Sequence, residues 1–212
     1  MRKRILCFGD SNTWGYVSTG GRFDEDTRWP MVMARLLGDG YMVVEEGFNG
    51  RTCVLDDPAE GGFKSGLNYL PPCLMSHNPL DAVIIMLGTN DTKRRFNMTA
   101  GTIARSLSYL VQAVQIYGET AAGQTPRIIV TAPPYILDNL MDTDFGDCFG
   151  PQSIAVSHGL GEAYRRVAEE MNVDFFDAAP VAEVSPVDAV HLTANGHLRL
   201  AEAMAEKIKT VL

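Results

Sequence analysis

The chain has 212 residues, of which 46% are hydrophobic and 21% are charged, close to the averages of globular proteins. This length lies within the usual range of one domain, so we expect residues 1–212 to form a single domain. The net charge of −8 argues against a nucleic-acid-binding protein and against docking on an anionic membrane, since both functions need a basic face.

The N-terminal segment and the cysteines indicate the cellular compartment. Residues 2–4 are basic, but only four apolar residues follow them, whereas a signal peptide needs roughly 7–15. No stretch approaches the ~20 apolar residues of a membrane span. The four cysteines show neither a CxxC motif nor the spacing of zinc ligands, which is typical of reduced thiols in the cytosol. We therefore expect a cytoplasmic protein.

Five short apolar runs predict five strands. They are residues 4–8, 41–45, 81–87, 127–132 and 173–177. The third and fourth runs lack polar alternation, which is typical of strands that helices cover on both faces.

Helical patterns lie between these runs. The first has apolar residues from Trp29 to Leu36 at helical spacing, with Thr27 as the expected cap and Pro30 near the first turn. The later patterns span residues 99–117, about 151–171, and 193 onwards. This alternation of strands and helices predicts a parallel sheet with right-handed crossovers in a three-layer α/β/α sandwich.

Two segments do not fit the alternation. Residues 65–77 are ambiguous because Pro71 and Pro72 would break or kink a helix there. Residues 133–150, rich in Pro, Asp and Gly, form the one long predicted loop, and loops of that length are usually functional or disordered. We expect the loop to line the ligand cleft or a subunit contact.

Ligands of open α/β sheets bind at the carboxyl ends of the strands. That rule selects residues 9–15, 47–52 and 88–91, together with the segment that leads to His191. All four segments carry the small or polar residues that suit a reaction centre.

Ser11 is the candidate nucleophile. It follows the first predicted strand by three residues, within GDSNTWG, where flanking glycines permit a tight turn. A serine hydroxyl needs a base to take its proton, and of the four histidines only His191 follows a strand and precedes a helix start. Asp188, three residues before His191, is the candidate that orients the imidazole and stabilises its charged form. Asp177, at the end of the fifth strand, is the alternative.

Asn90, in GTND, is the candidate oxyanion donor. Its side-chain amide can donate to the oxygen that becomes charged when Ser11 attacks an acyl carbon. Gly50 can add a main-chain N–H because glycine allows the backbone to approach a ligand closely. Asp10 and Asp91 are adjacent to these motifs, and we expect them to hold loop backbone rather than to transfer protons.

These motifs together resemble the four blocks of the SGNH (GDSL-type) hydrolases. GDSNTWG, FNGRT, GTND and DAVH occur in the order and spacing of those blocks, and the likeness extends over essentially the whole chain. It is greatest to bacterial arylesterases, a group that includes a mycobacterial esterase and acyltransferase. The resemblance implies a flavodoxin-like sandwich, a triad of Ser11, Asp188 and His191, and an oxyanion hole formed by Ser11, Gly50 and Asn90. It also implies a homo-oligomer.

Asn12 and Trp14 are the candidate substrate-binding residues. Asn12 replaces the Leu of the GDSL motif, and Trp14 is three residues beyond the nucleophile. If Trp14 walls the cleft, the site favours short acyl groups such as acetyl and disfavours water as the acceptor, which permits alcoholysis or perhydrolysis.

The predicted function is therefore hydrolysis of short-chain acyl and aryl esters, with a small-molecule ester as the partner and no cofactor or metal. A carbohydrate O-acetylesterase is the alternative within this class. A non-catalytic sugar- or phosphate-binding module is the alternative from another class, although GDSNTWG lacks both the GxxxxGK[ST] lysine and the GxGxxG spacing.

Overall fold

The computed structural model describes residues 2–212 and contains a five-stranded parallel sheet with strand order β2-β1-β3-β4-β5. The strands are β1 (Lys3–Gly9), β2 (Tyr41–Gly47), β3 (Ala82–Met86), β4 (Arg127–Ala132) and β5 (Asp174–Asp177). Each lies within two residues of a predicted apolar run. The predicted five-stranded parallel sheet is confirmed.

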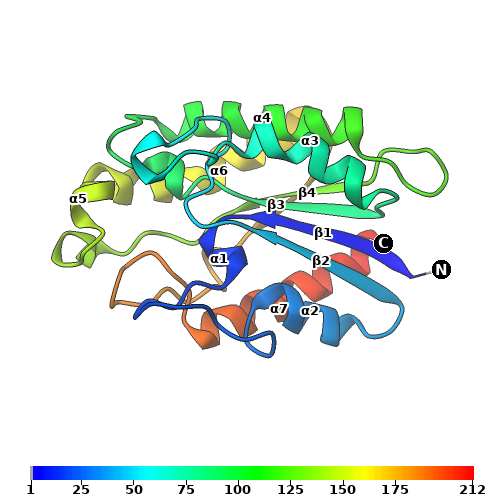
Figure 1. The fold of residues 1–212 in the computed structure, drawn as a ribbon, viewed down its shortest axis with the longest axis horizontal. Coiled ribbons are helices and arrows are strands. Elements are labelled where there is room, and N and C mark those ends of the chain that lie inside the picture. The colour runs from blue at the N-terminus through cyan, green and yellow to red at the C-terminus, as the bar shows by residue number, and fades with distance from the viewer. Residues whose placement is uncertain (1) are drawn as a thin grey trace.

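Helices cover both faces of the sheet (Figure 1). One face carries α3 (Gly66–His77), α4 (Ala100–Tyr117) and α6 (Gln152–Met171), and the other carries α2 (Trp29–Leu37) and α7 (Ala194–Val211). Side chains of β3 alternate between the two layers, because Val83 and Ile85 pack under one set of helices while Ile84 and Met86 pack under the other. The three-layer α/β/α sandwich is confirmed.

The first predicted helix, α2, begins at Trp29, one residue too late for Thr27 to be its N-cap. The hydroxyl of Thr27 bonds the Asp24 carboxylate at 2.8 Å, and the N-cap position of α2 is occupied by Arg28, which makes no side-chain capping bond. The prediction that Thr27 caps this helix is wrong, because the helix begins at Trp29 with Arg28 in the N-cap position and no side chain caps it.

The ambiguous segment 65–77 forms α3 with Pro71 and Pro72 inside the helix. The side chain of Ser65 accepts from the Asn68 N–H at 3.3 Å and caps the start. Leu70, Cys73 and Leu74 are buried against the core between the sheet and α4. Burial of this apolar face offsets the two missing proline donors.

The predicted long loop at 133–150 contains two short helical elements, η3 (Asp138–Asp142) and α5 (Gly146–Phe149). Its apolar side chains form a small cluster with residues that precede His191; the members are Ile136, Leu140, Phe149, Ala189 and Val190. The segment is therefore packed against the strand ends where the candidate site lies. None of the helices in residues 2–212 is apolar over enough of its length to cross a membrane.

His197 is a fully buried histidine in the first turn of α7. Its Nδ1 accepts the Trp29 main-chain N–H at 3.3 Å, and its ring meets Phe23 edge-on at 5.2 Å. Burial lowers the pKa of His197 to about 3, with smaller contributions from the nearby His191 and Arg28. The side chain is therefore neutral in the folded protein at neutral pH.

We expect this histidine to make the fold less stable in acid. Because the pKa is near 6.5 in the unfolded chain and about 3 in the folded one, the unfolded state binds the extra proton between those values. The contribution of His197 to the free energy of unfolding is then fully present above pH 6.5, and below that pH it falls by about 1.4 kcal/mol per pH unit. The measurement is urea unfolding of the wild type and His197→Gln at pH 7, 6 and 5.

Other buried groups titrate in the same pH range. The comparison of the wild type with His197→Gln therefore isolates the contribution of His197. Burial raises the pKa of Asp10 to about 6 and that of Asp91 to about 7, and both acids oppose the acid effect equally in wild type and variant. Equal pH slopes in the two proteins would contradict the prediction.

Candidate active site

Ser11 is the first residue of α1 (Ser11–Trp14), directly beyond the carboxyl end of β1 (Figure 1). The Asp10 side chain caps this short helix by accepting the Asn12 N–H at 2.9 Å. Gly9 allows the turn, because a Cβ there would lie 2.0 Å from the Thr13 hydroxyl oxygen. These constraints hold the Ser11 hydroxyl at the mouth of the sheet, where the side chain is 8% exposed.

The structure brings Ser11, His191 and Asp188 into one hydrogen-bonded chain. His191 Nε2 is 2.9 Å from Ser11 Oγ, and His191 Nδ1 is 2.7 Å from Asp188 Oδ2. Asp177 does not take this place, since its carboxylate accepts the Ala179 N–H instead. The geometry therefore agrees with Asp188 rather than Asp177 as the partner of the imidazole.

The local turn around Asp188 is held by the same carboxylate. Its Oδ1 accepts the main-chain N–H groups of Val190 at 3.1 Å and of His191 at 3.0 Å. Burial works to raise the pKa of Asp188, but the bonds to His191 and to the backbone outweigh it and hold the pKa below its ordinary value. Asp188 is therefore ionised at neutral pH and can stabilise a charged imidazole.

Asn12 is 2% exposed and faces away from substrate. Its amide nitrogen donates to the Val190 carbonyl at 3.2 Å, and its oxygen accepts the Leu192 N–H at 3.0 Å. The prediction that Asn12 binds substrate is wrong, because both ends of its amide are bonded to the backbone on either side of His191. The side chain instead ties the nucleophile turn to the histidine loop.

Asn90 begins the short helix η2 (Asn90–Thr92) after β3 and is 5% exposed. One hydrogen of its amide donates to the Arg51 carbonyl at 3.1 Å, which leaves the second hydrogen of the –NH₂ group for a ligand. Gly50, with φ of +78°, lies beside it on the cavity wall. Among the described residues, the main-chain N–H groups of Ser11 and Gly50 have no protein acceptor. Three donors are thus available at the positions that the sequence predicts.

Asp10 and Asp91 serve the backbone, as expected. Asp91 is fully buried and both of its oxygens accept the Cys53 N–H, at 3.0 and 3.1 Å. Neither carboxyl lines the cavity at Ser11.

The cavity beside Ser11 has a volume of about 410 Å³. Two aromatic rings pack on His191 there, with the Tyr16 ring centroid at 4.4 Å and that of Phe145 at 5.4 Å. Trp14 is not among the described residues that line this cavity, and its ring packs under the Arg22 guanidinium instead, 4.9 Å from the ring centroid. The prediction that Trp14 walls the cleft is therefore wrong. The bend after α1 directs Tyr16, two residues later, into that place.

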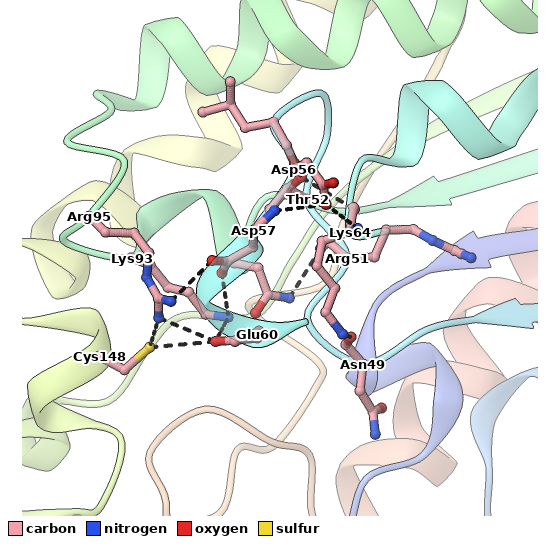
Figure 2. Close-up of polar contacts among 12 residues, drawn as sticks. Asn49, Arg51, Thr52, Asp56, Asp57, Glu60, Lys64, Lys93, Arg95 and Cys148 are labelled. Atoms are coloured by element: carbon pink, nitrogen blue, oxygen red, sulfur yellow. Dashed lines mark hydrogen bonds and ion pairs between the residues drawn. The ribbon is translucent and has the colours of Figure 1, made fainter. Parts of the chain in front are cut away.

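A charged wall, formed by Glu60, Lys64 and Lys93, bounds another side of the cavity. Figure 2 shows Glu60 pointing towards Lys93 and Arg95, with distances of 2.5 and 3.3 Å. Lys93 is only 3% exposed and also lies 3.9 Å from Asp57. Burial works to raise the pKa of Glu60, but Lys93 and the other cations outweigh it and lower the pKa.

Phe145 belongs to the loop 133–150, which the sequence predicts to line the cleft or a subunit contact, and it does line this cavity. The sequence did not predict the charged wall or Tyr16. Glu60 and Lys64 come from the connection between β2 and α3, which has no pattern. Lys93 follows the GTND motif by two residues, and this closeness to the motif was the only available signal.

The profile of the GDSL-like Lipase/Acylhydrolase family matches residues 7–199. Among solved structures, Est24, a carbohydrate acetylesterase from Sinorhizobium meliloti, is 38% identical with a TM-score of 0.90, over 100% of both chains. The native aryl esterase of M. smegmatis is 39% identical with a TM-score of 0.90, over 99% of this chain and 100% of the other. A search of the curated proteins gives no match.

These similarities agree with the site. A serine, a histidine and a carboxylate are hydrogen-bonded in sequence beside a cavity whose wall carries the N–H groups of Ser11, Gly50 and Asn90, and the family match spans all of these residues. The non-catalytic binding module considered from the sequence does not hold. The chain belongs to the GDSL-like lipase/acylhydrolase family and is a carboxylic-ester hydrolase.

Proposed function

We propose that the protein hydrolyses short-chain acyl esters, including aryl acetates, through an acyl-enzyme on Ser11. The observation that carries this proposal is the chain of contacts from Ser11 Oγ through His191 to Asp188, at 2.9 and 2.7 Å. A base at that distance is within reach of the hydroxyl proton.

The reaction has two halves. In the first, Ser11 Oγ attacks the acyl carbon while His191 Nε2 takes its proton, and Asp188 stabilises the resulting imidazolium. The N–H groups of Ser11 and Gly50 and the Asn90 amide donate to the oxyanion. When the intermediate collapses, the C–O bond to the alcohol breaks and the alcohol receives the proton from His191.

In the second half, water attacks the acyl carbon and gives a proton to His191. The bond to Ser11 Oγ then breaks, the proton returns to that oxygen, and the carboxylic acid leaves. The same donors serve both tetrahedral intermediates.

The walls of the cavity support a short acyl group. Tyr16 and Phe145 lie against His191 and narrow the space beside Ser11. A long alkyl chain would have to lie against Glu60, whose side chain is 32% exposed, and covering that carboxylate would remove part of its hydration, which is unfavourable. The aryl esterase of M. smegmatis, 39% identical, supports an aromatic leaving group.

Labelling with a serine-reactive phosphonate followed by peptide mapping tests the nucleophile. We expect a single adduct on Ser11, formed at the rate at which esterase activity is lost. An adduct on a different residue, or full labelling with activity retained, would contradict the proposal. The Ser11→Ala variant, treated in parallel, should remain unlabelled.

Deacetylation of carbohydrates is the second candidate function. The charged wall favours it because Glu60, Lys64 and Lys93 present donors and acceptors that suit sugar hydroxyls. The similarity to Est24, whose name describes a carbohydrate acetylesterase, points the same way. Values of kcat/KM for an acetylated sugar and for an aryl acetate, measured side by side, decide between them.

Acyl transfer to alcohol or peroxide is a proposed side activity. The aromatic rings on His191 limit the room for water near the acyl-enzyme, so an alcohol that binds there should compete well. With dilute alcohol present, we expect the ratio of transfer to hydrolysis to exceed the molar ratio of alcohol to water. The measurement is product analysis by chromatography, and a ratio no greater than the molar one would exclude the activity.

A further inference from the structure

A second cluster of reactive side chains lies outside the cavity, between β2 and α3. Among residues 2–212, Glu46, Cys73 and His77 each offer one possible ligand atom, and these atoms all lie within 4.8 Å of one another. Cys73 and His77 are four residues apart on α3, so both face the same side of the helix. Glu46 reaches them from the edge strand β2.

The Glu46 carboxylate is the centre of this cluster. Its Oε1 is 3.0 Å from His77 Nε2, and the ligand atom of Cys73 lies within 4.8 Å of the ligand atoms of both. A divalent ion can bind between the three atoms with little movement, because ligand atoms around a tetrahedral zinc are separated by roughly 3.3–3.8 Å when bond lengths are about 2.0–2.3 Å.

The charges of the three groups also suit a divalent cation. Glu46 and an ionised Cys73 supply two negative charges, and neutral His77 supplies a lone pair, so the complex with a divalent ion is neutral. The buried Arg51 guanidinium is a positive group close to the cluster, and it bonds the carbonyls of Gly9 and Glu46 and packs on the Phe8 ring at 4.2 Å. Arg51 is therefore held by other partners and need not move.

The cluster is both shielded and accessible. Cys73 is 3% exposed, whereas the side chains of His77 and Glu46 are 28% and 19% exposed. An ion can enter from the His77 side and keep a water as its fourth ligand. The mixed thiolate, imidazole and carboxylate set favours borderline ions such as Zn²⁺ over Mg²⁺ or Ca²⁺, which prefer oxygen alone.

We propose that Glu46, Cys73 and His77 form a binding site for one Zn²⁺-type divalent transition-metal ion, separate from the esterase site. Binding exchanges protons for the metal: the ion forms a bond to Cys73 Sγ, and the thiol proton leaves to solvent. His77 binds through Nε2 and keeps its proton on Nδ1. The ion then joins α3 to the edge strand of the sheet.

The thiol is protonated until the ion arrives. Burial, together with the Glu46 charge, raises the pKa of Cys73 to about 12, while Arg51 opposes the rise. A coordinated thiol is deprotonated by the metal itself. Metal binding should therefore release about one proton per ion, which calorimetry in buffers of different ionisation enthalpy measures.

Titration of the full chain with Co²⁺ tests the site without reference to catalysis. We expect one equivalent to give the thiolate-to-cobalt charge-transfer absorption and the d–d bands of a tetrahedral ion, and Zn²⁺ to displace it. Cys73→Ser should abolish the charge-transfer absorption. His77→Gln, a change on the accessible side of the cluster, should weaken binding by at least about 100-fold, since even indirect ligand contacts are worth 10- to 100-fold.

Cys148→Ser is the matched control, because Cys148 is the one free cysteine of the described chain that is not buried. That variant should bind Co²⁺ as the wild type does. The proposal is overturned if the wild type shows no thiolate absorption, if the absorption survives in Cys73→Ser, or if it is lost in Cys148→Ser. Circular dichroism shows whether each variant is folded. If Cys73→Ser is unfolded, the affinity of His77→Gln for Co²⁺ decides whether the proposed site exists.

Discussion

Replacement of His191 by alanine should lower kcat for ester hydrolysis by roughly 10⁴- to 10⁶-fold. The imidazole is the only base within hydrogen-bond reach of Ser11 Oγ among the described residues, at 2.9 Å. Without it the hydroxyl keeps its proton during attack, and the departing alcohol finds no acid. The measurement is steady-state hydrolysis of an aryl acetate, with KM determined separately.

The matched control is His158→Ala, an exposed histidine on α6 whose ring stacks on Tyr135 at 4.1 Å. It should retain the wild-type kcat. Since Ser11 and His191 act as a unit, the double variant Ser11→Ala/His191→Ala should be no slower than either single variant. A loss of less than about tenfold in His191→Ala would contradict the assigned base.

Replacement of Asn90 by alanine should lower kcat by roughly 10²- to 10³-fold, or about 3 kcal/mol, with little change in KM. The amide donates to the oxyanion only as charge develops, so its loss affects the transition state more than the bound ester. The variant should also be somewhat less stable, because the buried Arg51 carbonyl loses its donor.

The stability effect and the catalytic effect can be separated. Kinetics are measured well below the unfolding midpoint of the variant, where all of the protein is folded. Asn68→Ala, an exposed asparagine on α3, is the control and should match wild type in both kcat and KM. A rise in KM with unchanged kcat in Asn90→Ala would show that the amide binds the ester uniformly rather than stabilising the oxyanion.

Much of the fold could be predicted because it depends on local patterns. The runs that became β3 and β4 lack polar alternation, and both strands lie between two helical layers. The helix α3 was ambiguous because Pro71 and Pro72 are unfavourable locally, and only the burial of Leu70 and Leu74 against the core offsets them.

The residues of the candidate site also divide into those that a local motif predicts and those whose placement depends on tertiary contacts. Ser11, Asn90, Asp188 and His191 could be predicted because each lies in a short motif at a strand end, and parallel strands bring such ends together. Trp14 and Asn12 were interpreted wrongly because a side chain's direction after a four-residue helix depends on its neighbours. Arg22 lies over Trp14, and the backbone around His191 bonds Asn12.

The sequence by itself determined where the candidate groups lie along the chain: the proposed nucleophile after the first strand, the proposed oxyanion amide after the third, and the proposed base with its orienting carboxylate after the fifth. Only the tertiary structure decided what surrounds them. Tyr16, Phe145 and the charged wall of Glu60, Lys64 and Lys93 come from segments without a repeating pattern. The proposed metal cluster likewise joins Glu46 to a helix that begins about twenty residues later, at Gly66. Contacts of this kind follow from the packing of distant segments, which no local spacing encodes.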